Sequence, residues 1–82
     1  MRIVWDEPKR MRNIRNHEGL DFADLSPDFF QSSIVVAAKR GRLKAIGPFG
    51  DTLLSVIFTP LGAEAVSVIS MRRASRNERR LL

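Results

Sequence analysis

From residue 34 onward the chain consists of β-prone segments separated by glycine and proline, and this pattern limits most strongly the folds that are open to it. The first segment is an unbroken apolar run, and the second alternates polar and apolar side chains after a tight turn at Lys39-Arg40-Gly41. The third carries apolar side chains toward both faces, which is typical of a central strand. We therefore predict an antiparallel meander whose strands are residues 34–38, 42–47, 52–59 and 65–70.

Helical signals occupy the first third of the chain. Residues 3–5 are β-prone and end at Asp6, which can cap a helix that runs to about Asn16. A second helical region is predicted over residues 21–31, with a break expected near Ser26 because a proline follows it.

The C-terminal segment has a helix-start signature of its own. Ser75-Arg76-Asn77-Glu78 has the spacing of a capping box, so a last helix is predicted from Ser75 to Leu82. A helix of this length is marginal in isolation. It is therefore expected to pack on the sheet or on a partner.

The order of these elements predicts a single α+β domain over residues 1–82. We expect an antiparallel sheet of four to five strands, two N-terminal helices packed on one face, and the short C-terminal helix. A chain of 82 residues builds only a modest core. The other face of the sheet therefore meets either solvent or another chain, and the latter alternative would make the protein an oligomer.

Composition and the missing motifs exclude several functional classes. The chain has no cysteine, which rules out disulfides, thiolate metal sites and a nucleophilic cysteine. No glycine pattern of the nucleotide-binding or hydrolase type occurs, so enzymes that use NTP or NAD are not expected. No apolar run has the length of a signal peptide core or a membrane span, and a cytoplasmic protein is expected.

The charge of the chain favours an anionic partner. Fourteen Lys and Arg face nine Asp and Glu, which gives a formal charge of +5. Most of the basic residues are arginine, whose planar guanidinium group suits bidentate contact with phosphate. The last eleven residues hold five arginines and one acid. This distribution indicates RNA, DNA or an acidic protein as the partner.

His17 is the only histidine, and imidazole is the side chain best suited to proton transfer near neutral pH. At the end of a predicted helix it could equally be a structural residue that interacts with the helix dipole. A lone histidine does not form a zinc site, so no metal and no cofactor are expected. Trp5 also has two alternative interpretations: it could be a platform on which an RNA base stacks, or it could be part of the hydrophobic core.

The basic residues of the predicted sheet form the other candidate site. Arg42 and Lys44 alternate and so share one face, while Arg72, Arg73 and Arg76 follow the fourth strand. If the strands pair as a meander, these side chains converge. Arginines that hold a phosphodiester while the neighbouring 2′-hydroxyl attacks it would suffice for RNA cleavage. The alternative is that they form a solvated basic surface.

The residues that stand out resemble the BrnT family of bacterial type II toxins. In that family a Trp-Asp opening, a Lys-His-Gly segment, a Val-x-Phe/Tyr-Thr strand and an Ile-Ser-Ala-Arg-x-Ala-x-x-x-Glu-Arg ending recur together. The match extends over nearly the whole chain, and the combination in this order is more specific than any single piece. The matching residues are Trp5-Asp6-Glu7-Pro8-Lys9, Asn13, His17, residues 19–24, Arg42 with residues 45–47, residues 56–59, residues 69–75 and Glu78-Arg79.

The resemblance implies a ribonuclease toxin with a RelE-like fold that is neutralised by an antitoxin, BrnA. The ribbon-helix-helix part of the antitoxin would bind operator DNA, and toxin and antitoxin would form a hetero-oligomer that could contain a toxin dimer. In this hypothesis His17, Arg42 and Arg72 are catalytic, while Lys44, Arg73 and Arg76 bind RNA. Expression of such a toxin would arrest growth.

Two positions depart from the family pattern. Glu18 is inserted between His17 and Gly19, so either the histidine is shifted at the helix end or Glu18 stands in its place. Ser67 occupies a position that is often arginine. The predicted function is a metal-independent endoribonuclease that cleaves messenger RNA. The alternative is a non-catalytic module that binds nucleic acid or antitoxin, as a co-repressor subunit or a degenerate toxin.

Overall fold

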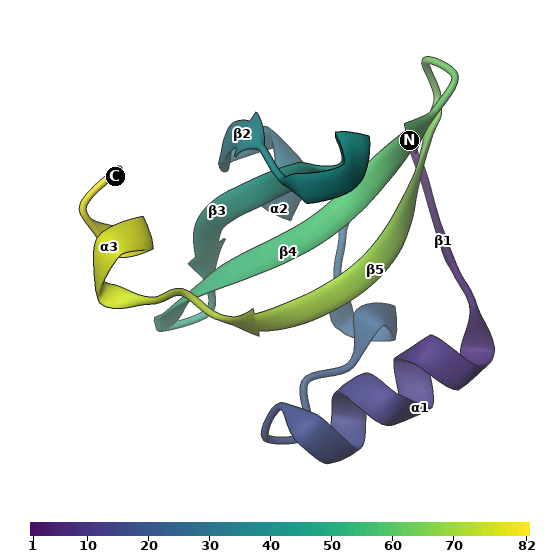
Figure 1. Ribbon diagram of the computed structural model, residues 1–82, viewed down its shortest axis with the longest axis horizontal. Coiled ribbons are helices and arrows are strands. Elements are labelled where there is room, and N and C mark those ends of the chain that lie inside the picture. The colour runs from purple at the N-terminus through teal and green to yellow at the C-terminus, as the bar shows by residue number, and fades with distance from the viewer.

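The chain folds around one five-stranded sheet with the strand order β1-β5-β4-β3-β2. The computed structural model describes residues 1–82, and Figure 1 shows the arrangement of its elements. In chain order the elements are β1 (Arg2–Trp5), α1 (Glu7–Asn16), the 3-10 helix η1 (Phe22–Asp24), α2 (Pro27–Gln31), β2 (Ile34–Ala37), the 3-10 turn η2 (Lys39–Gly41), β3 (Leu43–Phe49), β4 (Thr52–Leu61), β5 (Ala65–Arg73) and α3 (Arg76–Arg79).

The predicted meander is present, and the sheet as a whole is mixed. Strands β2 to β5 pair antiparallel in sequence order, with β4 in the centre as predicted. β1 instead pairs parallel with β5, in the register Arg2–Ala65 to Trp5–Val68. Asp6 starts α1 directly after Trp5, so no hairpin turn is available to β1. It therefore adds to the free edge of the last strand.

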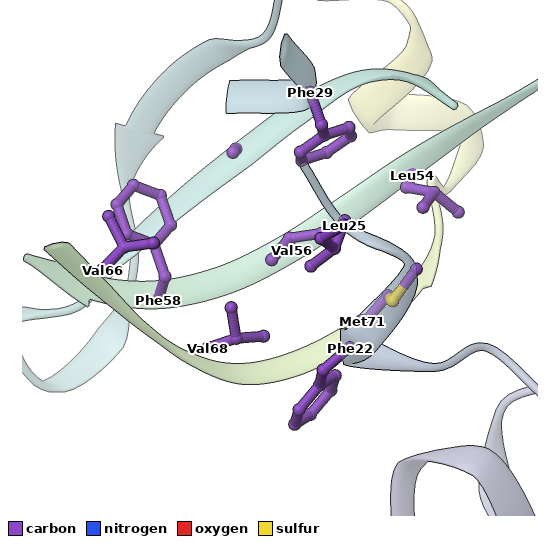
Figure 2. Close-up of a cluster of buried hydrophobic side chains, with 10 residues drawn as sticks. Phe22, Leu25, Phe29, Leu54, Val56, Phe58, Val66, Val68 and Met71 are labelled. Carbon is purple, nitrogen blue, oxygen red and sulfur yellow. The ribbon is translucent and has the colours of Figure 1, made fainter. Parts of the chain in front are cut away.

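The hydrophobic core lies between one face of this sheet and the segment that contains η1 and α2. Figure 2 shows Phe22 of η1 and Phe29 of α2 in one cluster with side chains of β4 and β5. Phe22, Leu54, Val56 and Met71 are fully buried. The aromatic rings contact one another edge-on, as in the pair Phe29–Phe30 at 5.3 Å between centroids. Trp5 joins this cluster through Phe22.

Gly47 of β3 allows the end of α2 to approach the sheet closely. A Cβ atom at this position would lie 2.2 Å from Oγ and 2.9 Å from Cα of Ser33. The Ser33 hydroxyl donates a hydrogen bond of 2.6 Å to the Phe29 carbonyl, so it is not free to move aside. Glycine is therefore required here by the contact between the two layers.

Helix α1 lies alongside β5 and does not cover the centre of the sheet (Figure 1). Among its residues only Asn13 is buried, so the helix has too little apolar surface to cover a sheet face. Arg10 links it to the next segment, because its Nε and Nη2 atoms donate to the Asp21 carboxylate at 2.7 and 2.9 Å. This contact lowers the pKa of Asp21.

The Asn13 side chain fixes α1 against the edge of β5. Its Nδ2 donates to the carbonyl of Met71 at 2.9 Å and to that of Leu20 at 3.0 Å, and its Oδ1 accepts from the Met71 N–H at 3.0 Å. The amide thus pairs with both backbone groups of Met71, which lies beyond the stretch of β5 that β1 covers. It acts as a continuation of the β1 strand.

The C-terminal helix starts where the sequence predicts it and is shorter than expected. The Ser75 hydroxyl accepts from the Glu78 N–H at 3.2 Å, and the Glu78 carboxylate accepts from the Ser75 N–H at 2.8 Å. The helical residues end at Arg79 instead of continuing to Leu82. None of the helices combines the length and the apolar character needed to cross a membrane.

Replacing Asn13 by Ala is expected to lower the free energy of unfolding by about 2–4 kcal/mol, because it leaves the buried backbone groups of Met71 and Leu20 without partners. Urea titration followed by circular dichroism measures this change. Asn16→Ala is the matched control, because Asn16 is exposed on the same helix, and its effect is expected to stay within about 0.5 kcal/mol. Equal midpoints for the two variants would contradict the assigned role.

Candidate functional site

Basic side chains gather on the face of the sheet opposite the core, which we call the open face. The register places Lys44 of β3 beside Ile57 of β4, and Ser55 of β4 beside Arg72 of β5. An open groove of about 570 Å³ runs over this face, and we call it the central groove. It is lined by Lys39, Arg40, Arg42, Lys44 and Arg72 together with Ala37, Ala38 and Ile57.

A bulge in β5 brings Arg72 to the open face. Val66 and Val68 point into the core, and simple alternation would carry residue 72 to the core side as well. The pairing instead shifts by one residue, because Phe58 pairs with Val68 and Ile57 with Ser70. Ile69 is the additional residue, and the bulge reverses the alternation after it. Met71 therefore enters the core and Arg72 leaves it.

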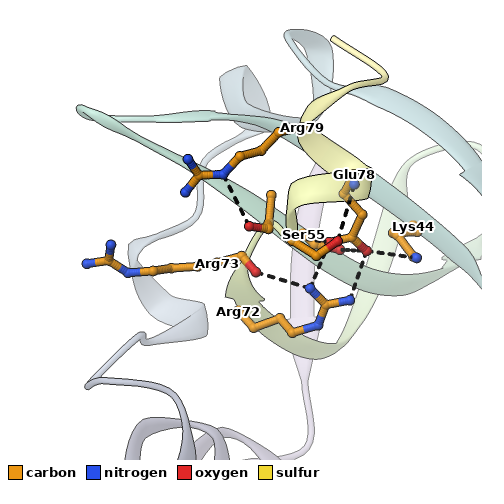
Figure 3. A network of polar contacts seen from close by, with 8 residues as sticks. Lys44, Ser55, Arg72, Arg73, Glu78 and Arg79 are labelled. Carbon is orange, nitrogen blue, oxygen red and sulfur yellow. Dashed lines mark hydrogen bonds and ion pairs between the residues drawn. The ribbon is translucent and has the colours of Figure 1, made fainter.

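The Glu78 carboxylate connects three strands beneath the groove (Figure 3). Oε1 accepts from Arg72 Nη1 at 2.7 Å and from the Ser75 N–H at 2.8 Å. Oε2 accepts from Arg72 Nη2 at 2.8 Å, Lys44 Nζ at 2.9 Å and Ser55 Oγ at 3.2 Å. The side chain is only 8% exposed. Five donors thus converge on one buried carboxylate.

These contacts shift the ionisation of both partners. The hydrogen bonds from Arg72, and then those from the Ser75 backbone and Lys44, hold the pKa of Glu78 far below its ordinary value of 4.5. The same carboxylate raises the pKa of Arg72. Both groups are charged at neutral pH. The pair therefore forms a fixed ionic element of the site.

Arg72 keeps one edge of its guanidinium group free. Nη1 donates to Glu78 and, at 3.1 Å, to the Arg73 carbonyl, while Nη2 gives one of its two hydrogens to Glu78. The Nε–H and the second hydrogen of Nη2 have no partner in the chain, and these two donors form a fork. A fork of this kind matches two oxygens of a phosphate. Glu78 thus holds Arg72 by one edge and leaves the other edge available.

Arg42 stands between the central groove and a second depression. This depression holds about 310 Å³ between α1 and β5, and we call it the α1 hollow. It is lined by Lys9, Arg12, Asn13, Asn16, His17, Arg42, Ile69 and Ser70. Arg42 lines both cavities and forms no ion pair. His17 and Arg72 therefore line different cavities that share one unpaired arginine.

The Glu18 insertion does not displace His17 from this site. His17 is the C-cap residue of α1 and faces the α1 hollow. Glu18 takes a left-handed conformation with φ 57°, followed by Gly19 with φ 78°. Its carboxylate lies on the outside, 2.7 Å from Nε of Arg73. The additional residue is thus accommodated in the turn after the helix.

Two of the predicted RNA-binding residues lie outside both cavities. Arg73 pairs with Glu18, and Figure 3 shows its guanidinium group pointing away from Arg72. Arg76 lines a separate depression of about 450 Å³ together with Arg79 and Arg80. The structure therefore places His17, Arg42, Lys44 and Arg72 in two cavities that share Arg42, and it separates Arg73 and Arg76 from them.

Sequence reasoning missed the residues that hold the site in place. The sequence predicts Glu78 as a helix cap and as part of the family ending, although a carboxylate among the five arginines that close the chain indicates a wider role. The sequence marks Asn13 only through the family resemblance and gives no signal for Ser55, because Asn13 acts through the backbone of β5 and Ser55 through Glu78 of α3, both far away in the sequence. No group of three His, Asp or Glu side chains is arranged to hold a metal ion.

The chain is similar to known proteins over almost its whole length. Residues 5–78 match the family model described as the ribonuclease toxin, BrnT, of type II toxin-antitoxin systems. The crystal structure of the Brucella abortus ribonuclease toxin BrnT superposes with a TM-score of 0.84 at 58% sequence identity, covering 93% of this chain and 99% of that one. No curated protein matches the chain.

Replacing Glu78 by Gln is expected to lower the free energy of unfolding by about 2–4 kcal/mol at pH 7, because Arg72 and Lys44 lose the carboxylate that compensates their charge. The loss should shrink as the pH falls from about 5 toward 2. Wild-type Glu78 stays ionised in the folded protein where the unfolded chain takes up a proton, so its contribution disappears at low pH.

The measurement is a series of urea titrations of both proteins between pH 2 and pH 7. Glu7→Gln is the control, because this exposed carboxylate also has a lowered pKa but lies away from the groove. A stability difference between wild type and Glu78→Gln that does not change with pH would contradict the assigned ionic role.

Proposed function

The chain belongs to the BrnT family of ribonuclease toxins of type II toxin-antitoxin systems, and from this we propose that it cleaves messenger RNA where the central groove meets the α1 hollow. The observation that carries this proposal is the position of Arg42, which lines both cavities. A phosphodiester bound at Arg42 has the free fork of Arg72 on one side and His17 on the other. The reaction needs no metal ion.

The basic residues of the central groove bind the substrate and stabilise the charge that develops on it. Five bases line the groove, and Glu78 is the only carboxylate that pairs with any of them. The excess of positive charge attracts the RNA backbone. Arg42, Arg72 and the two free hydrogens of the Lys44 ammonium then contact the phosphoryl oxygens, where charge increases in the transition state.

The cleavage step is an internal displacement at phosphorus. The 2′-oxygen attacks the adjacent phosphorus and loses its proton, and the bond from phosphorus to the 5′-oxygen breaks as that oxygen gains one. The products are a 2′,3′-cyclic phosphate and a 5′-hydroxyl end. His17 transfers the proton at one of these two oxygens as general acid or base, and water transfers it at the other.

A type II system supplies a protein antitoxin, so a partner of this kind follows from the family. We further propose that the antitoxin is of the BrnA type and has a ribbon-helix-helix part. The complex would bind operator DNA only through this part of the antitoxin. Such a complex is a hetero-oligomer that acts in the cytoplasm. An unneutralised toxin arrests growth by destroying transcripts.

Incubation of the purified protein with RNA separates an enzyme from a non-catalytic binding module. Cleavage that persists in EDTA and leaves cyclic phosphate ends supports the proposal. Retarded but intact RNA supports the binding module. RNA with a single 2′-deoxy nucleotide at the cleavage position should resist cutting, because the nucleophile is missing there.

Replacing Arg42 by Ala is expected to lower the rate of RNA cleavage by about 10²-fold or more, since one cationic contact to the transition state is lost. Arg42 has no ion-pair partner, so the fold should be unaffected. Single-turnover kinetics with a labelled oligonucleotide measure the effect, and Arg2→Ala removes the same charge elsewhere. A fully active Arg42→Ala variant would refute the assignment.

Arg72 requires a different substitution, because alanine would leave Glu78 without its main partner. Arg72→Lys keeps one cation beside Glu78 and removes the second edge of the guanidinium fork. We expect cleavage to fall by about 10²-fold while the urea midpoint changes little. Unchanged cleavage in this variant would exclude the bidentate phosphate contact.

His17→Ala is expected to lower kcat by about 10²–10⁴-fold, the usual contribution of a positioned acid or base, with little change in RNA affinity. Cleavage kinetics and binding of uncleavable 2′-O-methyl RNA separate the two quantities. Glu18→Ala should retain activity, because the Glu18 carboxylate faces away from the site. If the two variants lose activity equally, the proton-transfer role belongs elsewhere.

A further inference from the structure

We propose that the α1 hollow is a second phosphate-binding subsite, in which Lys9 and Arg12 hold a phosphate of the RNA next to the one that is cleaved. The inference rests on the proposed function, because it extends the path of the same substrate. It assigns a role to α1 residues that the cleavage chemistry does not use.

The first argument is the uncompensated charge of the hollow. Three of its eight lining residues, Lys9, Arg12 and Arg42, carry a permanent positive charge, and none is acidic. None of these three side chains forms an ion pair. In the central groove, by contrast, Glu78 neutralises part of the charge. Unpaired cations around one depression attract an anion and exclude other cations.

The second argument is the separation of charges on α1 itself. Arg10 turns toward Glu7 and Asp21 and forms ion pairs with both. Lys9, Arg12 and Asn16 recur at the helical spacing that places them on one side of the helix, and all three line the hollow. The helix therefore directs Arg10 toward the fold and two of its three unpaired cations, Lys9 and Arg12, toward the cavity.

The third argument is continuity with the cleavage site. Arg42 lines both cavities, so the two depressions are neighbours, and the proposed path carries the RNA strand past Arg42 from one to the other. RNA carries a negative charge at every nucleotide, which suits two adjacent basic depressions. Only Ile69 among the lining residues is apolar, so the hollow is poorly suited to an apolar peptide side chain.

The experiment measures binding of uncleavable 2′-O-methyl RNA at several salt concentrations by fluorescence anisotropy. Arg12→Ala is expected to weaken binding roughly 3- to 10-fold at low salt and to reduce the slope of log K against log salt by about 0.7, the value for one contact to a single strand. Lys9→Ala combined with Arg12→Ala should reduce the slope by about 1.4.

Arg15→Ala is the matched control. Arg15 lies on the same helix, is exposed like Arg12, forms no ion pair and lines neither cavity. Its removal deletes the same charge and should leave the salt slope unchanged. Equal effects of Arg12→Ala and Arg15→Ala, or no effect of either, would overturn the subsite.

The outcome is independent of cleavage, because the probe cannot be cut. If Arg12→Ala reduces the salt slope of RNA binding and the wild-type protein leaves ordinary RNA intact, the subsite is supported and the nuclease is refuted. Active cleavage with no Arg12 dependence of binding would refute the subsite and support the nuclease. If Arg12→Ala weakens binding of the purified antitoxin but not of RNA, the proposal is overturned, and the ligand of the α1 hollow is an acidic peptide instead.

Discussion

The geometry of the open face depends on the buried carboxylate of Glu78. Arg72 and Lys44 come from β5 and β3, and both carry positive charge toward the same groove. Without an anion between them, their mutual repulsion would favour conformations that turn away from the sheet. Glu78 reaches both cations, Ser55 of the strand between them and its own helix cap. One carboxylate thus fixes three strands, α3 and two cations at once.

This arrangement divides the basic residues into two groups with different tasks. Arg72 and Lys44 are compensated and positioned, and they offer only their remaining donors to a ligand. Arg42, Arg12 and Lys9 are uncompensated, so they supply the attraction for an anion. A positioned pair beside unpaired cations suits a substrate that must first be captured from solution and then aligned at one bond.

The sequence predicted the elements well, because their signals are local. Alternation in residues 42–47, the turn before them and the capping box at Ser75 each depend on near neighbours, and the structure contains all three. It did not predict the parallel pairing of β1 or the edge position of α1, because both depend on which strand offers a free edge. The bulge at Ile69 left no visible signal, yet it decides which face Arg72 occupies.

The candidate site was predictable as a set of basic residues, but its assembly was not. Arg42 and Lys44 share a face through simple alternation. The approach of His17 to Arg42 depends instead on Asn13, whose amide fixes α1 beside β5 and so brings the end of that helix to the edge of the open face. Asn13 and Glu78 each form hydrogen bonds to buried polar groups, and no buried side-chain nitrogen or oxygen lacks a hydrogen-bond partner. The positions of the residues proposed to act on RNA therefore depend on two structural side chains, those of Asn13 and Glu78.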